Sequence, residues 1–536
     1  MALKKIMRAA LIGLAVLASA VSSMAAEAFS LPSRYSIDLK PGSDVNRVIQ
    51  VLQSQKIKVV GSADMPDGPA VWIEIDPNNP PNVAALRPML PEVQAYAPDV
   101  PRKLLALGAG YSDVLLNGET LPWGIQAVQA AQVPFAGNRK VCIIDTGFAR
   151  GHPDLQTMRV DGIDKGAGKW DGSDGKPLHM HGTHVAGTMA AIGSNGRGVS
   201  GVIRTGNLDL FIVRAFGPDA TWIYAGELIA AMQDCADAGA NVISMSLGSP
   251  FASKAEERMV AKLTRQGILL VAAAGNDGNA LFHYPASYKG VLSVAAVDSN
   301  LTHAYFSQYN TRVQIAAPGV KVLSTVPVGT GFTPHLTVAG VEHAARSFEG
   351  SVKTTATGPL VDFGIGDTPD FSVAGKICLI RRGTNQFWEK VVNCEGSGGV
   401  GAVIYNNAPG EFTGTLGLLG AITSIPSVST SDVVGATLMG QLGQLATVNY
   451  TVHDYIASDG TSMAVPHVSA VAALVWSHFP GCTANHIRNA LRQSALRLST
   501  SGATDYFTGS GLVQAKAAFD YLAANPCLGS GSQYVE

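Results

Sequence analysis

Three side chains far apart in the sequence have the types that serine-dependent acyl transfer needs. Ser462 lies at the expected start of a helix, Asp145 follows a buried apolar run, and His181 lies between them in the chain. Serine attack on a carbonyl needs a base to take the hydroxyl proton and a carboxylate to orient that base. The order Asp, His, Ser is one of three orders in which unrelated serine hydrolases carry this set.

A fourth side chain completes the chemistry, although simpler interpretations exist for each residue. The amide of Asn276 and the backbone N–H of Ser462 can donate to the oxyanion of a tetrahedral intermediate. Taken alone, Ser462 is also a plausible helix N-cap, and Asp145 a cap or a metal ligand. A metal hydrolase that binds zinc remains an alternative enzyme class, with ligands from His179, His181 and His184. A folded binding protein without activity is the other alternative.

Buried strands must position these groups. Short apolar runs, each closely followed by a polar residue, predict a parallel sheet covered by helices; they are residues 141–144, 208–213, 242–245, 269–273 and 291–297. Open α/β sheets carry their chemistry at the carboxyl ends of the strands. We therefore expect Asp145, Ser246 and Asn276 to share one cleft. After Ser462, apolar residues at helical spacing predict a helix with one buried face.

The motifs around these residues resemble those of a subtilisin-like serine protease (subtilase). The matching stretches are Asp145-Thr146-Gly147, His181-Gly182-Thr183-His184, Ser246-Leu247-Gly248, Ala273-Ala274-Gly275-Asn276, Ala317-Pro318-Gly319 and Gly460-Thr461-Ser462-Met463-Ala464. The resemblance implies an α/β fold with a subtilisin-like parallel-sheet catalytic domain. It also implies a serine endopeptidase in which Asp145 orients His181, the general base, and Ser462 is the nucleophile.

The same resemblance assigns the remaining site residues. Asn276 is the expected oxyanion-hole side chain, and His184 is expected to be structural. The substrate-binding residues are expected to be Ser246, Leu247, Gly248, Ala273, Ala274 and Gly275. These segments pair with the main chain of an extended substrate, which predicts broad peptide specificity. His283 departs from the small residue common at the floor of the first specificity pocket, and we expect it to shorten that pocket or to accept polar groups.

The chain divides into segments of different texture. Residues 26–102 read as a β-α-β-β-α-β, ferredoxin-like α+β domain that resembles an inhibitor I9 propeptide; an unrelated binding domain is the alternative. The catalytic domain is expected at 121–331 and 453–527, interrupted by a β-rich insertion at 332–452 that resembles a protease-associated (PA) domain. That insertion shapes access for large substrates or is a spacer. The resemblance implies that the enzyme cleaves its own propeptide, and this cleavage is expected between about residues 100 and 121.

The N-terminus predicts export. Lys4, Lys5 and Arg8 precede a short apolar run, and small residues at 23–25 suit a signal peptidase, so residues 1–25 read as a signal peptide. A membrane anchor is the alternative, although the apolar run is short for a span. We therefore expect a secreted, extracellular protein. Residues 528–536 read as a flexible tail. The formal net charge of −2 argues against a nucleic-acid partner.

Six cysteines suit an oxidising compartment. Order along the chain favours the pairs Cys378–Cys394 and Cys482–Cys527, leaving Cys142 with Cys235 as a third pair or as two buried thiols.

No cofactor is expected for catalysis. The sequence leaves undecided whether Asp154 binds a structural calcium ion, with further oxygen ligands from the loop at 195–196. The alternative is that Asp154 is a helix N-cap. The expected partners are protein and peptide substrates and the chain's own propeptide as intramolecular inhibitor, with the mature protein a monomer.

Overall fold

The computed structural model describes residues 33–75, 88–105, 107–109, 118–156, 159–218, 220, 222–348, 350–416, 423–498 and 505–527. The predicted signal peptide and the tail at 528–536 lie outside these residues. The described residues form two compact units, with the division between residues 100 and 101. Among the described helices, none combines the length and apolarity needed to cross a bilayer.

The first unit is a four-stranded antiparallel sheet with one described helix. The strand order is β2-β3-β1-β4, with β1 (Ser33–Leu39), β2 (Lys58–Ala63), β3 (Ala70–Ile75), β4 (Val93–Pro98) and the helix α2 (Val45–Ser54). Asp44 caps α2 by accepting from the N–H of Arg47. The predicted second helix, 84–90, falls partly outside the described residues, and its described end, 88–90, is not helical.

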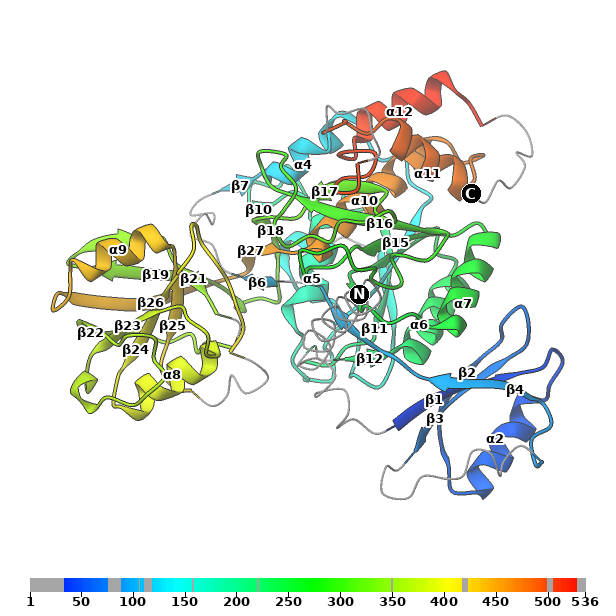
Figure 1. Cartoon of the computed structure of the whole chain (residues 1–536). Helices are drawn as coiled ribbons and strands as arrows, with labels where there is room; N and C mark the ends of the chain where they lie inside the picture. The colour runs from blue at the N-terminus through cyan, green and yellow to red at the C-terminus, as the bar shows by residue number, and fades with distance from the viewer. Residues whose placement is uncertain are drawn as a thin grey trace, which may run out of the picture. The chain divides into compact units, whose positions relative to one another are not determined.

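The second unit is built on a seven-stranded parallel sheet, as the apolar runs predict (Figure 1). Its order is β17-β16-β15-β13-β8-β11-β9. The strands are β8 (Lys140–Asp145), β9 (Arg159–Asp164), β11 (Asp209–Arg214), β13 (Val242–Met245), β15 (Leu269–Ala273), β16 (Val291–Val297) and β17 (Ile315–Pro318). The five apolar runs left two of these strands unpredicted: β9, whose alternation of exposed and buried residues is typical of an edge strand, and β17, which has only four residues.

Helices cover both faces of this sheet. Side chains alternate along a strand: Val141 and Ile143 of β8 pack in one cluster with the buried residues of α5 (Met180–Ala190) and α10 (Thr461–His478). Cys142, between them, points to the other face and is bonded to Cys235 on α6 (Ala225–Asp237). The buried face of α7 (Lys254–Arg265) packs on β15. The catalytic candidates on α5 and α10 therefore belong to the same layer.

Shorter elements complete the unit. They are β5 (Pro101–Leu104), β6 (Leu107–Ala109), β7 (Glu119–Thr120), α4 (Trp123–Ala127), η1 (Ala130–Gln132), η2 (Pro153–Leu155), β10 (Gly198–Val199), β12 (Ile223–Tyr224), β14 (Leu247–Gly248), β18 (Val322–Thr325), β27 (Tyr455–Asp459), α11 (Ala484–Gln493) and α12 (Ala515–Ala524). Three small sheets join them: β10-β7, β12-β5-β14 and β18-β27-β6. The second of these carries the candidate site.

The chain between β18 and β27 forms an eight-stranded mixed sheet of its own, in the order β20-β19-β26-β22-β23-β24-β25-β21 (Figure 1). Its strands are β19 (Gly331–Val338), β20 (Val341–His343), β21 (Arg346–Ser347), β22 (Ala356–Asp362), β23 (Ile377–Arg381), β24 (Gly401–Tyr405), β25 (Ser427–Thr430) and β26 (Leu445–His453), with η3 (Phe371–Val373), α8 (Phe387–Gly396) and α9 (Asp432–Met439). The antiparallel pair of β19 and β26 begins and closes the segment, because Gly331 pairs with His453.

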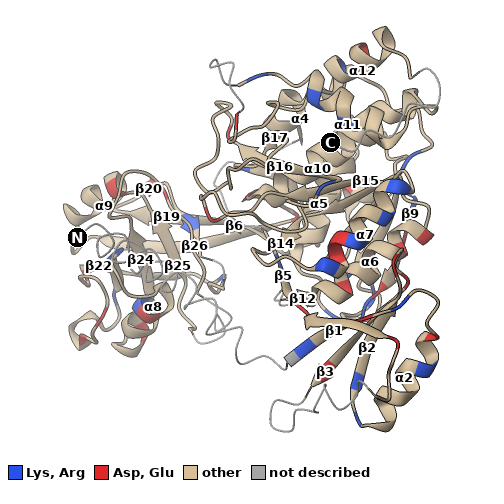
Figure 2. Cartoon of the chain, turned by 45° about the vertical axis from the view of Figure 1, so that its right-hand side comes forward, with Lys and Arg blue, Asp and Glu red and all other residues tan. Residues whose placement is uncertain are grey.

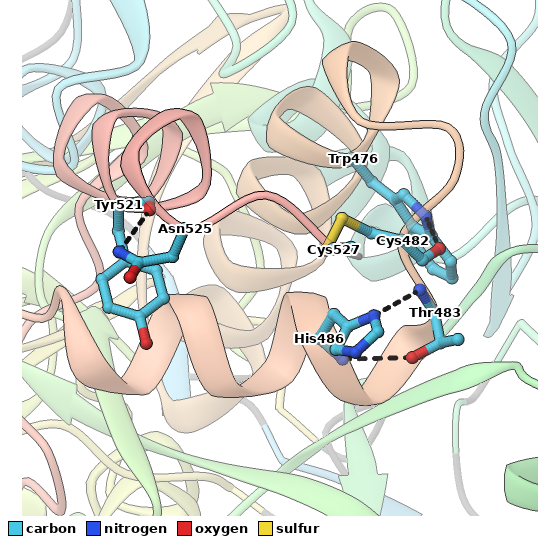
Figure 3. Close-up of a disulfide and its surroundings, with 7 residues drawn as sticks. All are labelled: Trp476, Cys482, Thr483, His486, Tyr521, Asn525 and Cys527. Atoms are coloured by element: carbon cyan, nitrogen blue, oxygen red, sulfur yellow. Dashed lines mark hydrogen bonds between the residues drawn. A yellow bond between two sulfur atoms is a disulfide. The ribbon is translucent and has the colours of Figure 1, made fainter. Parts of the chain in front are cut away.

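All six cysteines form disulfides, with the pairing predicted from their order: Cys142–Cys235, Cys378–Cys394 and Cys482–Cys527. The alternative of free thiols at Cys142 and Cys235 is wrong. Figure 3 shows that Cys482–Cys527 ties the end of the chain to the start of α11, where Thr483 and His486 cap the helix reciprocally. His486 lies close to both sulfurs, but cysteines bonded to each other offer no thiolates to a metal.

Candidate active site

The first pair of site residues is Asp145 and His181. Asp145 is the last residue of β8, and His181 lies in the first turn of α5. His181 donates from Nδ1 to both carboxylate oxygens, at 2.8 and 2.9 Å, and both side chains are buried. A carboxylate in this position fixes the ring and leaves Nε2 as the proton acceptor.

A glycine makes this pair possible. A Cβ on Gly182 would lie 2.2 Å from the carbonyl oxygen of Gly147, a distance at which no side chain fits. The start of α5 can therefore pack directly against the chain leaving β8. Thr146 links the chain that leaves β8 to the start of α5, because its hydroxyl accepts from the N–H of Gly182 and donates to the carbonyl of His179.

Ser462 is the second residue of α10 and is completely buried. Pro466, four residues on, has no N–H, so the carbonyl of Ser462 loses its helical donor. The hydroxyl of Ser246 donates to that carbonyl instead, at 2.8 Å. The hydroxyl of Ser462 donates to the carbonyl of Ser246 at 2.9 Å. Ser246 thus holds the start of α10 beside the end of β13.

Two donors converge on one carbonyl oxygen beside this serine. Asn276 donates from Nδ2 to the carbonyl of Leu105 at 2.7 Å, and the N–H of Ser462 donates to the same oxygen at 3.1 Å. Thr461 holds the amide in place, since its N–H and hydroxyl both donate to Oδ1 of Asn276, at 2.9 and 2.8 Å. This is the geometry required of an oxyanion hole, and a peptide carbonyl of the chain itself occupies it.

The segment ending at Leu105 lies as an extended strand through the cleft. β5 is the central strand between β12 and β14, antiparallel to both, with Leu104 opposite Leu247 and Lys103 opposite Gly248. The N–H of Leu105 donates to the carbonyl of Ser246 at 3.2 Å. Backbone pairing of this kind holds a peptide regardless of most of its side chains.

Leu105 itself is buried in an apolar setting. It belongs to the main hydrophobic cluster, and a Cβ added to Gly248 would lie 3.3 Å from its Cδ1. The pocket beside the carbonyl therefore accepts an apolar side chain of leucine size.

The structure brings together most of the residues expected for substrate binding. Ser246, Leu247 and Gly248 pair with β5. Ala273 is the last residue of β15, and Ala274 and Gly275 connect it to Asn276. The N–H of Ala274 donates to the carbonyl of Val294, which fixes the backbone that carries the Asn276 amide.

His283 is completely buried, and Nδ1 of its ring has no hydrogen-bond partner among the described residues. Its ring packs against Gly275, where an added Cβ would lie 2.9 Å from the ring. Its Nε2 donates to Asp277 at 2.7 Å. The hydrogen bond from His283 is the largest cause that lowers the pKa of Asp277. His283 is thus a supporting residue behind Gly275.

The histidines of the zinc alternative have separate structural partners. His184 interacts through Nε2 with the carbonyls of Val322 and Ile456, and burial lowers its pKa to about 3. His179 caps α5, accepting from the N–H of His181. Within the described parts of the chain, the three rings do not gather their nitrogens around one point that an ion could occupy.

The surroundings of Asp154 do not fit calcium. Its oxygens accept from the amide of Asn195 (2.9 Å), the N–H of Val199 (2.9 Å) and the hydroxyl of Tyr455 (3.0 Å). Calcium takes oxygen ligands, whereas an N–H repels it. Glu119 likewise accepts from the backbone N–H groups of residues 194–196. Asp154 is not an N-cap either, because His152 caps η2.

Sequence reasoning divided residues 101–105 between the propeptide-like domain (26–102) and the segment before the catalytic domain, and did not predict that they lie in the cleft. It also missed two groups that contact Arg102 of that segment, Ser249 and Glu256. The pair Arg102-Lys103 was visible in the sequence, but nothing in it shows which acidic residue the folded chain brings to an arginine 154 positions away.

Comparisons with known proteins agree with this arrangement. A model of the subtilase family matches residues 137–361 and 427–513, and a PA domain model matches residues 356–438. Subtilisin DY of Bacillus licheniformis is 39% identical over 220 residues, 40% of this chain and 77% of that protein. Subtilisin BL of Lederbergia lenta is 38% identical over 234 residues, 42% and 82% respectively. A solved psychrophilic subtilisin-like protease from Pseudoalteromonas sp. AS-11 is 39% identical, with a TM-score of 0.54, covering 77% of this chain and 100% of its own.

Proposed function

This chain belongs to the subtilase family of serine peptidases, and from that premise we propose that it cleaves peptide bonds through Asp145, His181 and Ser462. Ser462 attacks the substrate carbonyl while His181 takes the hydroxyl proton and Asp145 stabilises the resulting imidazolium. Asn276 and the N–H of Ser462 bind the oxyanion. His181 then protonates the leaving amine, and water releases the acyl group from Ser462 by the same steps in reverse.

One observation carries the proposal. The carbonyl of Leu105 accepts hydrogen bonds from Asn276 Nδ2 and from the N–H of Ser462. Ser462 is also the residue whose hydroxyl is the proposed nucleophile. Within the described residues Nε2 of His181 has no hydrogen-bond partner, and the hydroxyl of Ser462 donates to Ser246. Catalytic hydrogen bonds often tighten only when the reaction proceeds, so a modest rotation of the Ser462 side chain is required of the mechanism.

We extend the proposal to maturation: the enzyme cleaves its own chain after Leu105. The support is the strand β5, which lies between β12 and β14 as a substrate would and ends with its carbonyl at the two donors. This bond lies inside the window of residues 100–121 expected from the sequence. The preceding α+β unit then acts as the inhibitory propeptide, a role supported by its resemblance to inhibitor I9 domains.

Export is a further part of the proposal. The N-terminal pattern of a signal peptide and three disulfides are both typical of proteins that leave the reducing cytoplasm. We propose that the PA domain, inserted between β18 and β27, shapes the access of large substrates to α10.

The test is expression of the wild type and Ser462→Ala with intact-mass measurement of the products. We expect the wild type to yield a mature chain beginning at residue 106, and Ser462→Ala to keep its propeptide. A serine-directed fluorophosphonate should label only the wild type. Equal processing of both would refute self-cleavage, and unlabelled, folded wild type would refute the serine mechanism.

A further inference from the structure

The side chain of Arg102 is completely buried although it carries a charge. Counting back from Leu105 as the first residue, Arg102 is the fourth residue before the proposed cleaved bond. It lies on β5 opposite Ile223 of β12. Its neighbours toward the bond, Lys103 and Leu104, are only partly buried. Arg102 and Leu105 are therefore the two side chains of this segment that the protein encloses.

The group that receives Arg102 is a buried carboxylate. Arg102 donates from Nε to Oε1 of Glu256 at 3.0 Å and from Nη2 to Oε2, a two-point contact between side chains that are both 0% exposed. Nη1 donates to the hydroxyl of Ser249 at 2.8 Å and to the carbonyl of Pro101 at 2.9 Å. Planar carboxylate and guanidinium groups match in this geometry, which an ammonium group cannot reproduce.

Glu256 is part of the fixed framework of the cleft. It lies in the first turn of α7, three residues after the capping residue Ser253, where the helix dipole favours a negative charge. Figure 2 shows acidic residues, drawn in red, on α7. Tyr288 hydrogen-bonds to Ser253, and burial together with the Glu256 carboxylate raises its pKa, so it stays neutral. Glu256 thus supplies the pocket's negative charge.

A buried carboxylate without a partner is strongly destabilising. Release of the segment ending at Leu105 removes the cationic partner of Glu256, and a substrate arginine at the same position restores it. An apolar side chain leaves the carboxylate with Tyr288 but without a counter-charge, and an acidic side chain adds repulsion. The backbone pairing along β5 has no such selectivity.

We propose that Glu256, with Ser249, forms a specificity pocket that selects arginine at the fourth residue before the cleaved bond. The inference rests on the proposed function and narrows its substrates to extended peptides with this arginine and an apolar residue such as leucine next to the bond. Broad specificity then holds for the intervening positions only.

The experiment measures kcat/KM of the matured enzyme on quenched fluorescent peptides that copy residues 100–109. Four peptides carry arginine, lysine, leucine or glutamate in place of Arg102. We expect the wild type to prefer arginine over leucine by about 30-fold or more, the size expected when one partner of a buried charge pair is removed. Lysine should fall between them, and glutamate should be poorest.

Two variants separate the pocket from the helix surface. Glu256→Leu should abolish the preference for arginine and favour the leucine peptide, and Glu256→Gln should reduce the preference. Glu257→Gln is the matched control, because Glu257 is the next residue of α7 but is partly exposed and pairs with Lys254. It should keep the wild-type order. The comparison of the four peptides on the wild-type enzyme is sufficient to refute the proposal, so the test does not depend on whether the Glu256 variants fold.

The outcomes distinguish the two levels of inference. Hydrolysis of all four peptides at equal kcat/KM by enzyme that reacts with fluorophosphonate would overturn the pocket and leave the proposed function intact. No hydrolysis and no labelling would overturn the proposed function. In that case, fluorescence anisotropy measures the affinities of the arginine and leucine peptides for the same protein. Equal affinities would refute the proposal that the pocket selects arginine.

Discussion

Asn276 has two separable tasks, and substitution can test each. Its Nδ2 donates to the carbonyl of Leu105 at 2.7 Å, whereas its Oδ1 accepts twice from Thr461. Asn276→Leu removes both contacts. Asn276→Asp keeps an acceptor for Thr461 and replaces the donor by a group that repels an oxyanion. Both variants should lose turnover, but only Asn276→Leu should also loosen the start of α10.

The size of the expected loss in kcat follows from the oxyanion donor that remains in the variant. The N–H of Ser462 still reaches the oxygen at 3.1 Å, so Asn276→Leu removes one of two donors. A hydrogen bond to a charged group contributes about 1.5–3 kcal/mol. For the oxyanion donor of subtilisin, a member of the same family, the measured loss is about 10²–10³ in kcat, and we adopt that figure. The loss of the Thr461 contacts should cost about 1 kcal/mol of stability.

The assay is steady-state hydrolysis of the arginine peptide by chains matured to residue 106. We expect kcat to fall about 10²–10³-fold with KM nearly unchanged, because the interaction strengthens only in the transition state. Asn300→Leu, on an exposed turn, is the control. An unchanged kcat in a folded Asn276→Leu enzyme would refute the assignment of this amide to the oxyanion, and a raised KM beside that unchanged kcat would assign it to substrate binding in the ground state.

Three further predictions concern maturation and stability. Leu105→Asp should slow self-processing at least about 100-fold, because the side chain enters an apolar cluster; time-resolved mass measurement would contradict this if it showed wild-type rates. Burial lowers the pKa of His467 to about 4 and that of His184 to about 3. Below about pH 6.5 the unfolded chain therefore binds protons that the folded chain excludes, and stability falls as the pH drops toward 4, by on the order of 1 kcal/mol per pH unit for each histidine. Urea unfolding of Ser462→Ala at pH 7 and pH 5 measures this, and His467→Gln should make the dependence shallower; an identical slope would refute it. Removing the Cys142–Cys235 disulfide, which spans 93 residues, should lower the free energy of unfolding by about 4.6 kcal/mol, against about 3 kcal/mol for Cys378–Cys394, which spans 16; calorimetry of the two double serine variants would contradict the loop-entropy argument if the order were reversed.

Much of the architecture was predictable because its signals are local. Apolar runs ending at Asp145, Arg214 and Ser246 predict parallel strands, and the structure has β8, β11 and β13 at those places. Patterns that mix exposed and buried residues are weaker, which is why β9 was missed. The sequence left calcium at Asp154 undecided because one carboxylate does not define a site, and the donors that surround it come from residues 195, 199 and 455.

By itself, the sequence determined the chemical groups: a carboxylate after a strand, a histidine and a serine at helix starts, and an amide after another strand, in short motifs whose spacing is local. Only the tertiary structure decided what meets them. It brings Leu105 to Asn276 and Ser462, and Arg102 to Glu256, across 154 residues or more. Such contacts depend on the packing of separate elements, because a two-point contact between a carboxylate and a guanidinium requires both groups to be held at hydrogen-bond distance in a matching orientation.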